Sequence, residues 1–179
     1  MANSSKSKGD KAEREAVLVL NDLASDLTVS RPRRKLGAGR KDDEGDLDVF
    51  PDATVQVKFW PAAVNASVRE AAIDAQAQSS RAGTPFHTGM VCLPNVRTQA
   101  VRWVAATLEW PGFRPTDDEL ALFALVPKAL AHIRREDIGV PRRRRIALVR
   151  YADTPDIFVA PIDAWLLAYR RARAAALAA

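Results

Sequence analysis

The sequence predicts an α/β domain in which helices flank a central mixed sheet. Three observations lead to this class. Segments whose apolar residues recur every three or four positions alternate along the chain with short segments of strand length, and such alternation is typical of layered α/β domains. The composition is 47% hydrophobic and 27% charged, the usual balance of a globular chain. A length of 179 residues fits one domain.

The N-terminal segment is predicted to form an amphipathic helix over 11–27, where apolar residues follow the helical period. Asp10, Glu13 and Glu15 are expected in its first turn, because the positive end of the helix dipole favours acidic side chains there. Residues 1–8 are mostly small, polar or lysine, so we expect them to form a flexible tail before a single domain.

A basic loop and a hairpin are predicted next. Residues 31–41 contain one proline and two glycines, which favour a loop or an irregular hairpin over a helix. The segments DLDVF (46–50) and TVQVKF (54–59) alternate polar and apolar residues on either side of the turn-forming PDA. They therefore predict two antiparallel strands joined by a tight turn.

The rest of the chain reads as further helices and strands. A helix is expected over 116–136, because it opens with the capping pattern Thr-x-x-Glu at Thr116. Pro127 should kink or split this helix. The other expected elements are a helix over 62–82 that stops at Gly83, strands over 86–93, 100–110, 145–152 and 156–161, and a C-terminal helix from about Ile162.

Basic residues are clustered in this chain, whose net charge is +5. Clustered cations gain affinity for polyanions by releasing counterions from phosphates, so the clusters favour a nucleic acid as partner. The run at 142–145 is open to either a DNA contact or a solubilising role. The run at 31–41 precedes an acidic stretch whose repulsion of DNA it would offset, and we expect phosphate contacts from Arg31, Arg33, Arg34, Lys35, Arg40 and Lys41.

Cysteine content and hydropathy limit the other possibilities. Cys92 is the single cysteine, which excludes an intrachain disulfide and a thiolate zinc site. No apolar run approaches the roughly 20 residues that span a bilayer. No secretory signal is recognisable at the start of the chain. We therefore expect a cytoplasmic protein that does not bind membranes.

Polar residues of the predicted hairpin form a candidate site. If 51–53 make a three-residue turn, Asp48 faces Gln56 and Asp46 faces Lys58, so the four side chains share one face. Carboxylate and amide oxygens are the ligands that Mg²⁺ or Mn²⁺ prefers, and a lysine can stabilise charge on a reacting phosphate. The pattern fits metal-assisted phosphodiester cleavage, and it also fits the solvated face of an ordinary hairpin.

Three stretches resemble a known group of nucleases. The pattern D…QVK resembles the PD-(D/E)xK nuclease signature, with Gln56 where glutamate is usual. KGDKAERE (8–15) is similar to the K-G-x-x-x-E-R element that opens the first helix of archaeal-type Holliday-junction resolvases and related phage proteins. GRKDDEGDLDVF is similar to resolvase-like endonucleases of actinobacterial phages, in which the acid of GDL binds metal. That favours Asp46 over Asp48.

The resemblance implies a fold, an activity and a set of site residues. The implied fold is the restriction-endonuclease-like three-layer fold, and the activity is that of a metal-dependent DNA endonuclease of the Holliday-junction resolvase type. Glu13, Asp46 and Gln56 would hold Mg²⁺ or Mn²⁺, and Lys58 would assist the nucleophile. Because a four-way junction has two strands to cut symmetrically, the resemblance also implies a homodimer, active in the bacterial host cytoplasm if phage-encoded.

The resemblance covers 8–93, so we expect 94–145 to be an elaboration of the single domain that 9–179 forms. Two alternatives stay open. One is another repair or restriction-type nuclease of the same superfamily. The other is a DNA-binding or phage structural protein that keeps the fold without cleavage, which the neutral side chain of Gln56 allows.

Overall fold

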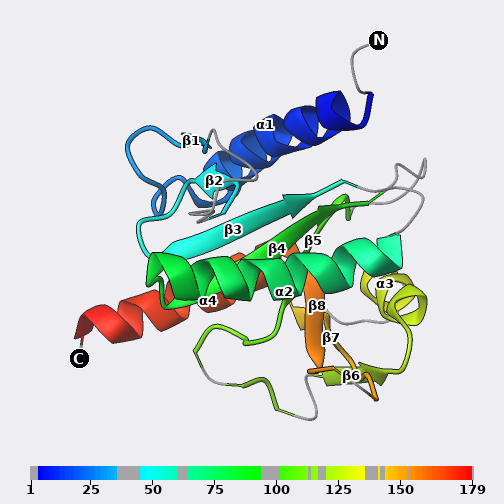
Figure 1. Cartoon of the computed structure of the whole chain (residues 1–179). Helices are drawn as coiled ribbons and strands as arrows, with labels where there is room; N and C mark the ends of the chain where they lie inside the picture. Colours follow the sequence, from blue (N-terminus) through cyan, green and yellow to red (C-terminus); the bar gives the residue numbers. More distant parts are fainter. Residues whose placement is uncertain are drawn as a thin grey trace.

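A computed structural model describes residues 4–35, 45–59, 64–93, 101–112, 114–116, 120–135, 141, 144–152 and 154–178. Its strands form one eight-stranded sheet in the order β1-β2-β3-β4-β5-β8-β7-β6. The elements are α1 Ser4–Ala24, β1 Arg33–Arg34, β2 Leu47–Asp48, β3 Ala53–Lys58, α2 Val64–Ala82, β4 Phe86–Cys92, β5 Trp103–Thr107, β6 Leu120–Phe123, α3 Val126–Arg134, β7 Ile146–Val149, β8 Ile157–Pro161 and α4 Ile162–Ala178 (Figure 1).

The sheet is mixed, as the sequence predicted. β3 and β4 are parallel, joined by the crossover helix α2, and β6 and β7 are also parallel. The remaining neighbours pair antiparallel. β5 lies between β4 and β8 in the middle of the sheet, so the 94–145 region contributes a central strand as well as the edge strand β6.

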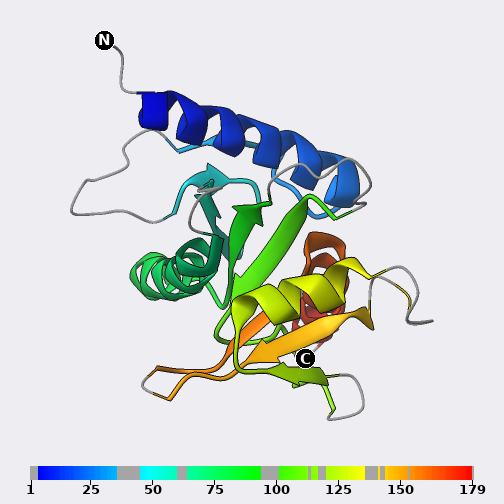
Figure 2. The ribbon, with the colours of Figure 1, turned by 90° about the vertical axis from the view of Figure 1, so that its right-hand side faces the viewer.

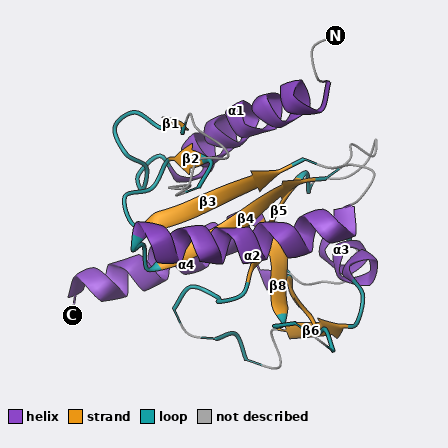
Figure 3. Ribbon diagram, viewed as in Figure 1, coloured by secondary structure: helices purple, strands orange, loops and turns teal. Residues whose placement is uncertain are grey.

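Helices cover both faces of the sheet, which gives three layers (Figures 2 and 3). On one face, α1 and α4 bury Leu20 and Trp165 against strand residues such as Val55 and Met90. On the other face, α2 and α3 bury Val68 and Ile133 with a second set of strand residues. Successive strand side chains point to opposite faces, so each strand feeds both cores. Among the described residues no helix is long and apolar enough to cross a membrane.

The helices α2 and α4 follow the expected bounds closely. α2 ends at Ala82, and Gly83 follows with φ of 67°. This left-handed conformation is the usual way for a helix to end, and glycine adopts it without the steric cost of a Cβ. The predicted stop at Gly83 is therefore confirmed. α4 begins at Ile162, where the sequence placed it.

The helix α1 begins earlier than the sequence predicted. It starts at Ser4, so it includes part of the segment expected to be a tail, and its first turn holds no acidic residue. The assignment of Asp10, Glu13 and Glu15 to the first turn was therefore wrong. These acids instead pair with arginines from elsewhere in the chain, Arg34 and Arg102.

The helix expected over 116–136 is only half present. Leu120–Phe123 forms β6, which pairs parallel with Ile146–Val149 of β7, and the helix α3 begins only at Val126. Pro127 lies in the first turn of α3, where its fixed φ and missing N–H suit a helix start. The sheet therefore overrides the helical preference of 120–123, and Pro127 begins the helix rather than kinking it.

Candidate functional site

The candidate site lies on the α2 side of the sheet, near its β1–β2 end. Gln56 and Lys58 alternate along β3 with Val55 and Val57, which belong to the core under α1 and α4. Gln56 is aligned with Gly89 of the neighbouring β4, and a Cβ at Gly89 would collide with α2. Gln56 and Lys58 therefore face α2, on one side of the sheet, as the alternation predicted.

The register of the hairpin differs from the expected one by two residues. Leu47 pairs with Val55, whereas the expected register pairs Leu47 with Val57. The predicted pairs Asp46–Lys58 and Asp48–Gln56 were therefore wrong. The reason is that Val49 leaves the hairpin and accepts a hydrogen bond from the backbone N–H of Val29 at 2.8 Å, which lengthens the connection. A shift by two leaves Gln56 and Lys58 on the face that the alternation predicted.

Asp46 is held tightly against β3. Its side chain is buried, with 8% of the residue exposed, and its Oδ2 accepts the backbone N–H of Val57 at 2.8 Å. Its own N–H donates to the carbonyl of Val55 at 3.1 Å, and its carbonyl accepts the N–H of Lys35 at 2.7 Å. The turn into this position needs the preceding Gly45, whose φ of 107° other residues rarely adopt.

Gln56 contributes a buried amide oxygen. The residue is 7% exposed, and its Oε1 has no hydrogen-bond partner in the part of the chain that the structure describes. A buried acceptor without a donor is costly, so it marks a place where a cation or water would be favoured. With the Asp46 carboxylate, which is bonded to the backbone of the next residue, Val57, it fits the oxygen-donor chemistry of Mg²⁺ or Mn²⁺. Within the described ranges, no three Asp, Glu, His or Cys side chains gather as a metal-binding group.

Lys58 ends β3, and its ammonium group contacts an acid that sequence reasoning missed. Its Nζ lies 2.8 Å from Oδ2 of Asp74 on α2. Asp74 lies one helical turn before Gln78, which is buried. The i, i+4 spacing of these two residues on α2 was the available signal, because it places both on one side of the helix.

Glu13 contacts the β1–β2 ribbon, the paired residues 33–34 and 47–48, from the α1 side of the sheet. Its Oε2 lies 2.5 Å from Nε of Arg34, whose Nη2 also contacts Oδ1 of Asp10 at 2.7 Å. Arg34 is paired with Leu47, whose side chain belongs to the core under α1. Glu13 is therefore placed on the α1 side of the sheet, whereas Gln56 and Lys58 face α2.

The charge state of Arg34 is consistent with its ion pairs to Glu13 and Asp10, which join β1 to α1. Burial is the largest single influence and lowers the pKa of Arg34, but its hydrogen bonds and charge interactions with Glu13 and Asp10 together raise that pKa above its ordinary value. The guanidinium thus stays charged and joins α1 to the ribbon. This geometry gives Arg34 a structural role, in addition to the phosphate contact expected from the sequence.

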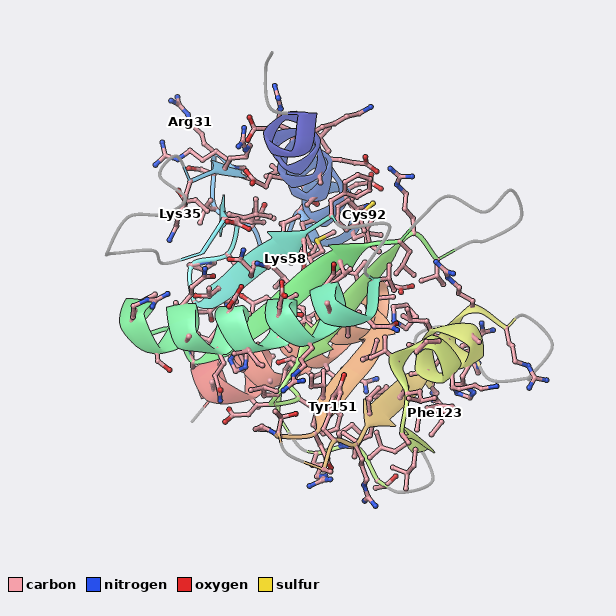
Figure 4. The ribbon with its side chains drawn as sticks, turned by 45° about the vertical axis from the view of Figure 1, so that its right-hand side comes forward. Arg31, Lys35, Lys58, Cys92, Phe123 and Tyr151 are labelled. Atoms are coloured by element: carbon pink, nitrogen blue, oxygen red, sulfur yellow. The ribbon has the colours of Figure 1, made fainter. Side chains whose placement is uncertain are left out.

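The other ribbon cations are more open to solvent. Arg31 is exposed, and the side chain of Arg33 is 74% exposed, with its Nε 3.1 Å from Oδ2 of Asp48. Figure 4 shows Arg31 and Lys35 beside the ribbon, and Lys58 above α2. The remaining two cations predicted to contact DNA, Arg40 and Lys41, lie outside the described residues.

The basic run at 142–145 ends in Arg145, whose side chain has a structural role. Arg145 is buried, and its Nη1 donates to the backbone carbonyl of Ile133 at 3.3 Å and also to that of Arg135. It therefore satisfies carbonyls at the C-terminal end of α3, where a cation is favoured. A DNA contact by Arg145 is incompatible with this burial.

Comparisons with protein-family models, with curated proteins and with solved structures find no match for this chain.

Proposed function

We propose that the protein is a metal-dependent DNA endonuclease, of the restriction-endonuclease-like fold, that resolves four-way Holliday junctions. The observation that carries the proposal is the position of Gln56 and Lys58 on one face of β3, with the Asp46 carboxylate bonded to the backbone N–H of the intervening Val57. The exposed Arg31 and Arg33 lie on the neighbouring ribbon. The order of α1, the β1–β3 ribbon, α2 and β4 also supports the resemblance to resolvases.

Asp46 and Gln56 would hold Mg²⁺ or Mn²⁺ in this proposal. When bound, such a metal supplies an activated water and neutralises charge on the phosphate. The backbone N–H of Val57 fixes one oxygen of Asp46, so the carboxylate is oriented before any ligand binds. Lys58 would donate a hydrogen bond to the oxygen on which charge develops in the transition state.

The basic ribbon would guide the phosphate backbone to this face. Arg31 is exposed, and Arg33 shares a solvent-exposed ion pair with Asp48 that a phosphate can displace at small cost. Lys35 is tied to Asp46 by a backbone hydrogen bond, which places the ribbon next to the site. A homodimer would present two such sites to the two strands of a junction.

A second candidate is a DNA-binding protein that does not cleave. Three observations favour it: Gln56 is neutral, Lys58 is paired with Asp74, and Glu13 is paired with Arg34. A carboxylate at position 56 would bind a divalent cation more strongly than an amide does. This candidate keeps the ribbon as its DNA contact and needs no metal.

The deciding experiment is cleavage of a labelled four-way junction, with linear duplex and flap DNA alongside, in Mg²⁺, Mn²⁺ and EDTA. The variants are Asp46→Asn and Lys58→Met, with Glu70→Gln on an exposed position of α2 as control. Paired nicks in the junction alone, lost in EDTA and in both site variants but kept in the control, would support a resolvase. Cutting of every substrate would indicate a general nuclease, and binding without cleavage would leave the second candidate.

A further inference from the structure

We propose that Asp74 is an internal competitor for the DNA phosphate that binds Lys58, so that DNA must displace Asp74 from the Lys58 ammonium group. The inference rests on the proposed binding of DNA at this face of the sheet. The contact that carries it is the 2.8 Å ion pair between Nζ of Lys58 and Oδ2 of Asp74.

The ion pair is accessible to an incoming ligand. The side chain of Lys58 is 26% exposed and that of Asp74 is 44% exposed. A pair this open to solvent changes an equilibrium by only a few fold, so a phosphate can replace the carboxylate. An ammonium group carries three N–H donors, which lets Lys58 exchange one anionic partner for another without moving far.

The position of α2 does not depend on this ion pair. The helix is held to the sheet by Val68, Ala71, Ala72 and Ala75, which are fully buried. Its close approach at Gly89 leaves no room for even one methyl group. Loss of the Lys58–Asp74 contact should therefore leave α2 in place, and the acid is available for a role in binding.

The charge of Asp74 opposes DNA in two ways. While the pair is closed, its carboxylate cancels the charge of Lys58, the one cation of the Asp46–Gln56–Lys58 set. When a phosphate reaches Lys58, the carboxylate becomes a like charge close to it, and like charges in contact disfavour binding. Removal of the Asp74 charge should thus tighten DNA binding, and only when Lys58 is present to receive the phosphate.

The test is a double-mutant cycle on DNA affinity, measured in EDTA so that cleavage plays no part. Fluorescence anisotropy with a labelled four-way junction compares the wild type, Asp74→Asn, Lys58→Met and the double variant. We expect Asp74→Asn to tighten binding by about two- to five-fold. In the Lys58→Met background the same change should have an effect below about 1.5-fold, because the coupling is lost.

A matched control separates this effect from a general change of charge. Glu70 lies one turn earlier on α2 and is exposed, so Glu70→Gln removes the same charge from the same helix. An equal gain from Glu70→Gln, or a gain from Asp74→Asn that persists without Lys58, would overturn the inference and leave the proposed function intact. So would an unchanged affinity in Asp74→Asn.

The remaining outcomes distinguish this inference from the proposed function. Failure of both the wild type and Asp74→Asn to bind any DNA would overturn the two together. Binding with the expected coupling, but no cleavage in Mg²⁺ or Mn²⁺, would remove the nuclease and support the role of Asp74. Circular dichroism and thermal unfolding of Asp74→Asn, a near-isosteric change at a half-exposed side chain, check that the fold is kept.

Discussion

Replacing Gly89 with alanine should force α2 away from the sheet and destabilise the whole domain. A Cβ at Gly89 would lie 2.4 Å from the Cβ of Ala71 and 2.5 and 2.7 Å from its carbonyl carbon and oxygen. Carbon atoms in contact are normally about 3.5–4.0 Å apart, so the helix must retreat by roughly 1 Å. Two of the three atoms are backbone, so no side-chain rotation can relieve the overlap.

The expected cost follows from what α2 buries. Val68, Ala71, Ala72 and Ala75 are fully buried, and a retreat of α2 loosens all of them. Overpacking of this kind costs about 1–3 kcal/mol, and the rigid backbone on both sides places Gly89→Ala near about 3 kcal/mol. For a chain of this length that lowers Tm by about 6–12 °C.

Urea and thermal unfolding of Gly89→Ala test this prediction, with Gly9→Ala as the matched control. Gly9 lies inside α1, and a Cβ there would meet no atom within 4 Å. The control should raise the free energy of unfolding by about 0.5–1 kcal/mol, because alanine is the better helix former. A Gly89→Ala variant within about 0.5 kcal/mol of the wild type would refute the close approach of α2.

Three other predictions test the ribbon and the buried groups. Arg34→Met should lower the free energy of unfolding by about 1–2 kcal/mol, because it leaves Glu13 and Asp10 without their shared cation. Arg31→Met should weaken DNA binding and leave the free energy of unfolding unchanged within about 0.5 kcal/mol. Equal stability of the two variants in urea would contradict this prediction. Burial raises the pKa of Cys92 to about 11, so Ellman's reagent at pH 8 should label the thiol only as the protein unfolds, and rapid labelling of the native protein would contradict this. Burial, and then the hydrogen bond to Asp52, raise the pKa of Tyr169. The folded state therefore keeps a proton that the unfolded state releases near pH 10, and the free energy of unfolding should fall as pH rises above about 10. Tyr169→Phe should reduce that fall in urea titrations between pH 9 and 11, and an unchanged slope would be the contrary result.

The hairpin illustrates how far local patterns reach. The alternation in TVQVKF placed Gln56 and Lys58 on one face and the valines on the other, and the structure confirms those faces. The register of β2 against β3 could not be predicted from the sequence, because it depends on the residue at which the chain leaves the hairpin. Val49 leaves it to bond Val29, a contact with a segment twenty residues earlier that no local pattern encodes.

In the segment 120–127, pairing with a distant strand overrode the local helical preference. Its sequence suits a helix start, and Leu120–Phe123 became a strand because β7 offers a parallel partner. A proline within a helical pattern is equally compatible with a kink and with a first turn. Only the neighbouring strand decided between them, so tertiary pairing overrode propensity.

The sequence by itself determined the α/β class, most element positions and the faces of the hairpin, because apolar periodicity and turn residues act over a few neighbours. It also singled out Asp46, Gln56 and Lys58 as candidates. The tertiary structure decided their partners: Val57 for Asp46, Asp74 for Lys58, and Arg34 for Glu13. These contacts join residues 11 to 21 positions apart, and contacts over such separations follow from how helices and strands pack against one another.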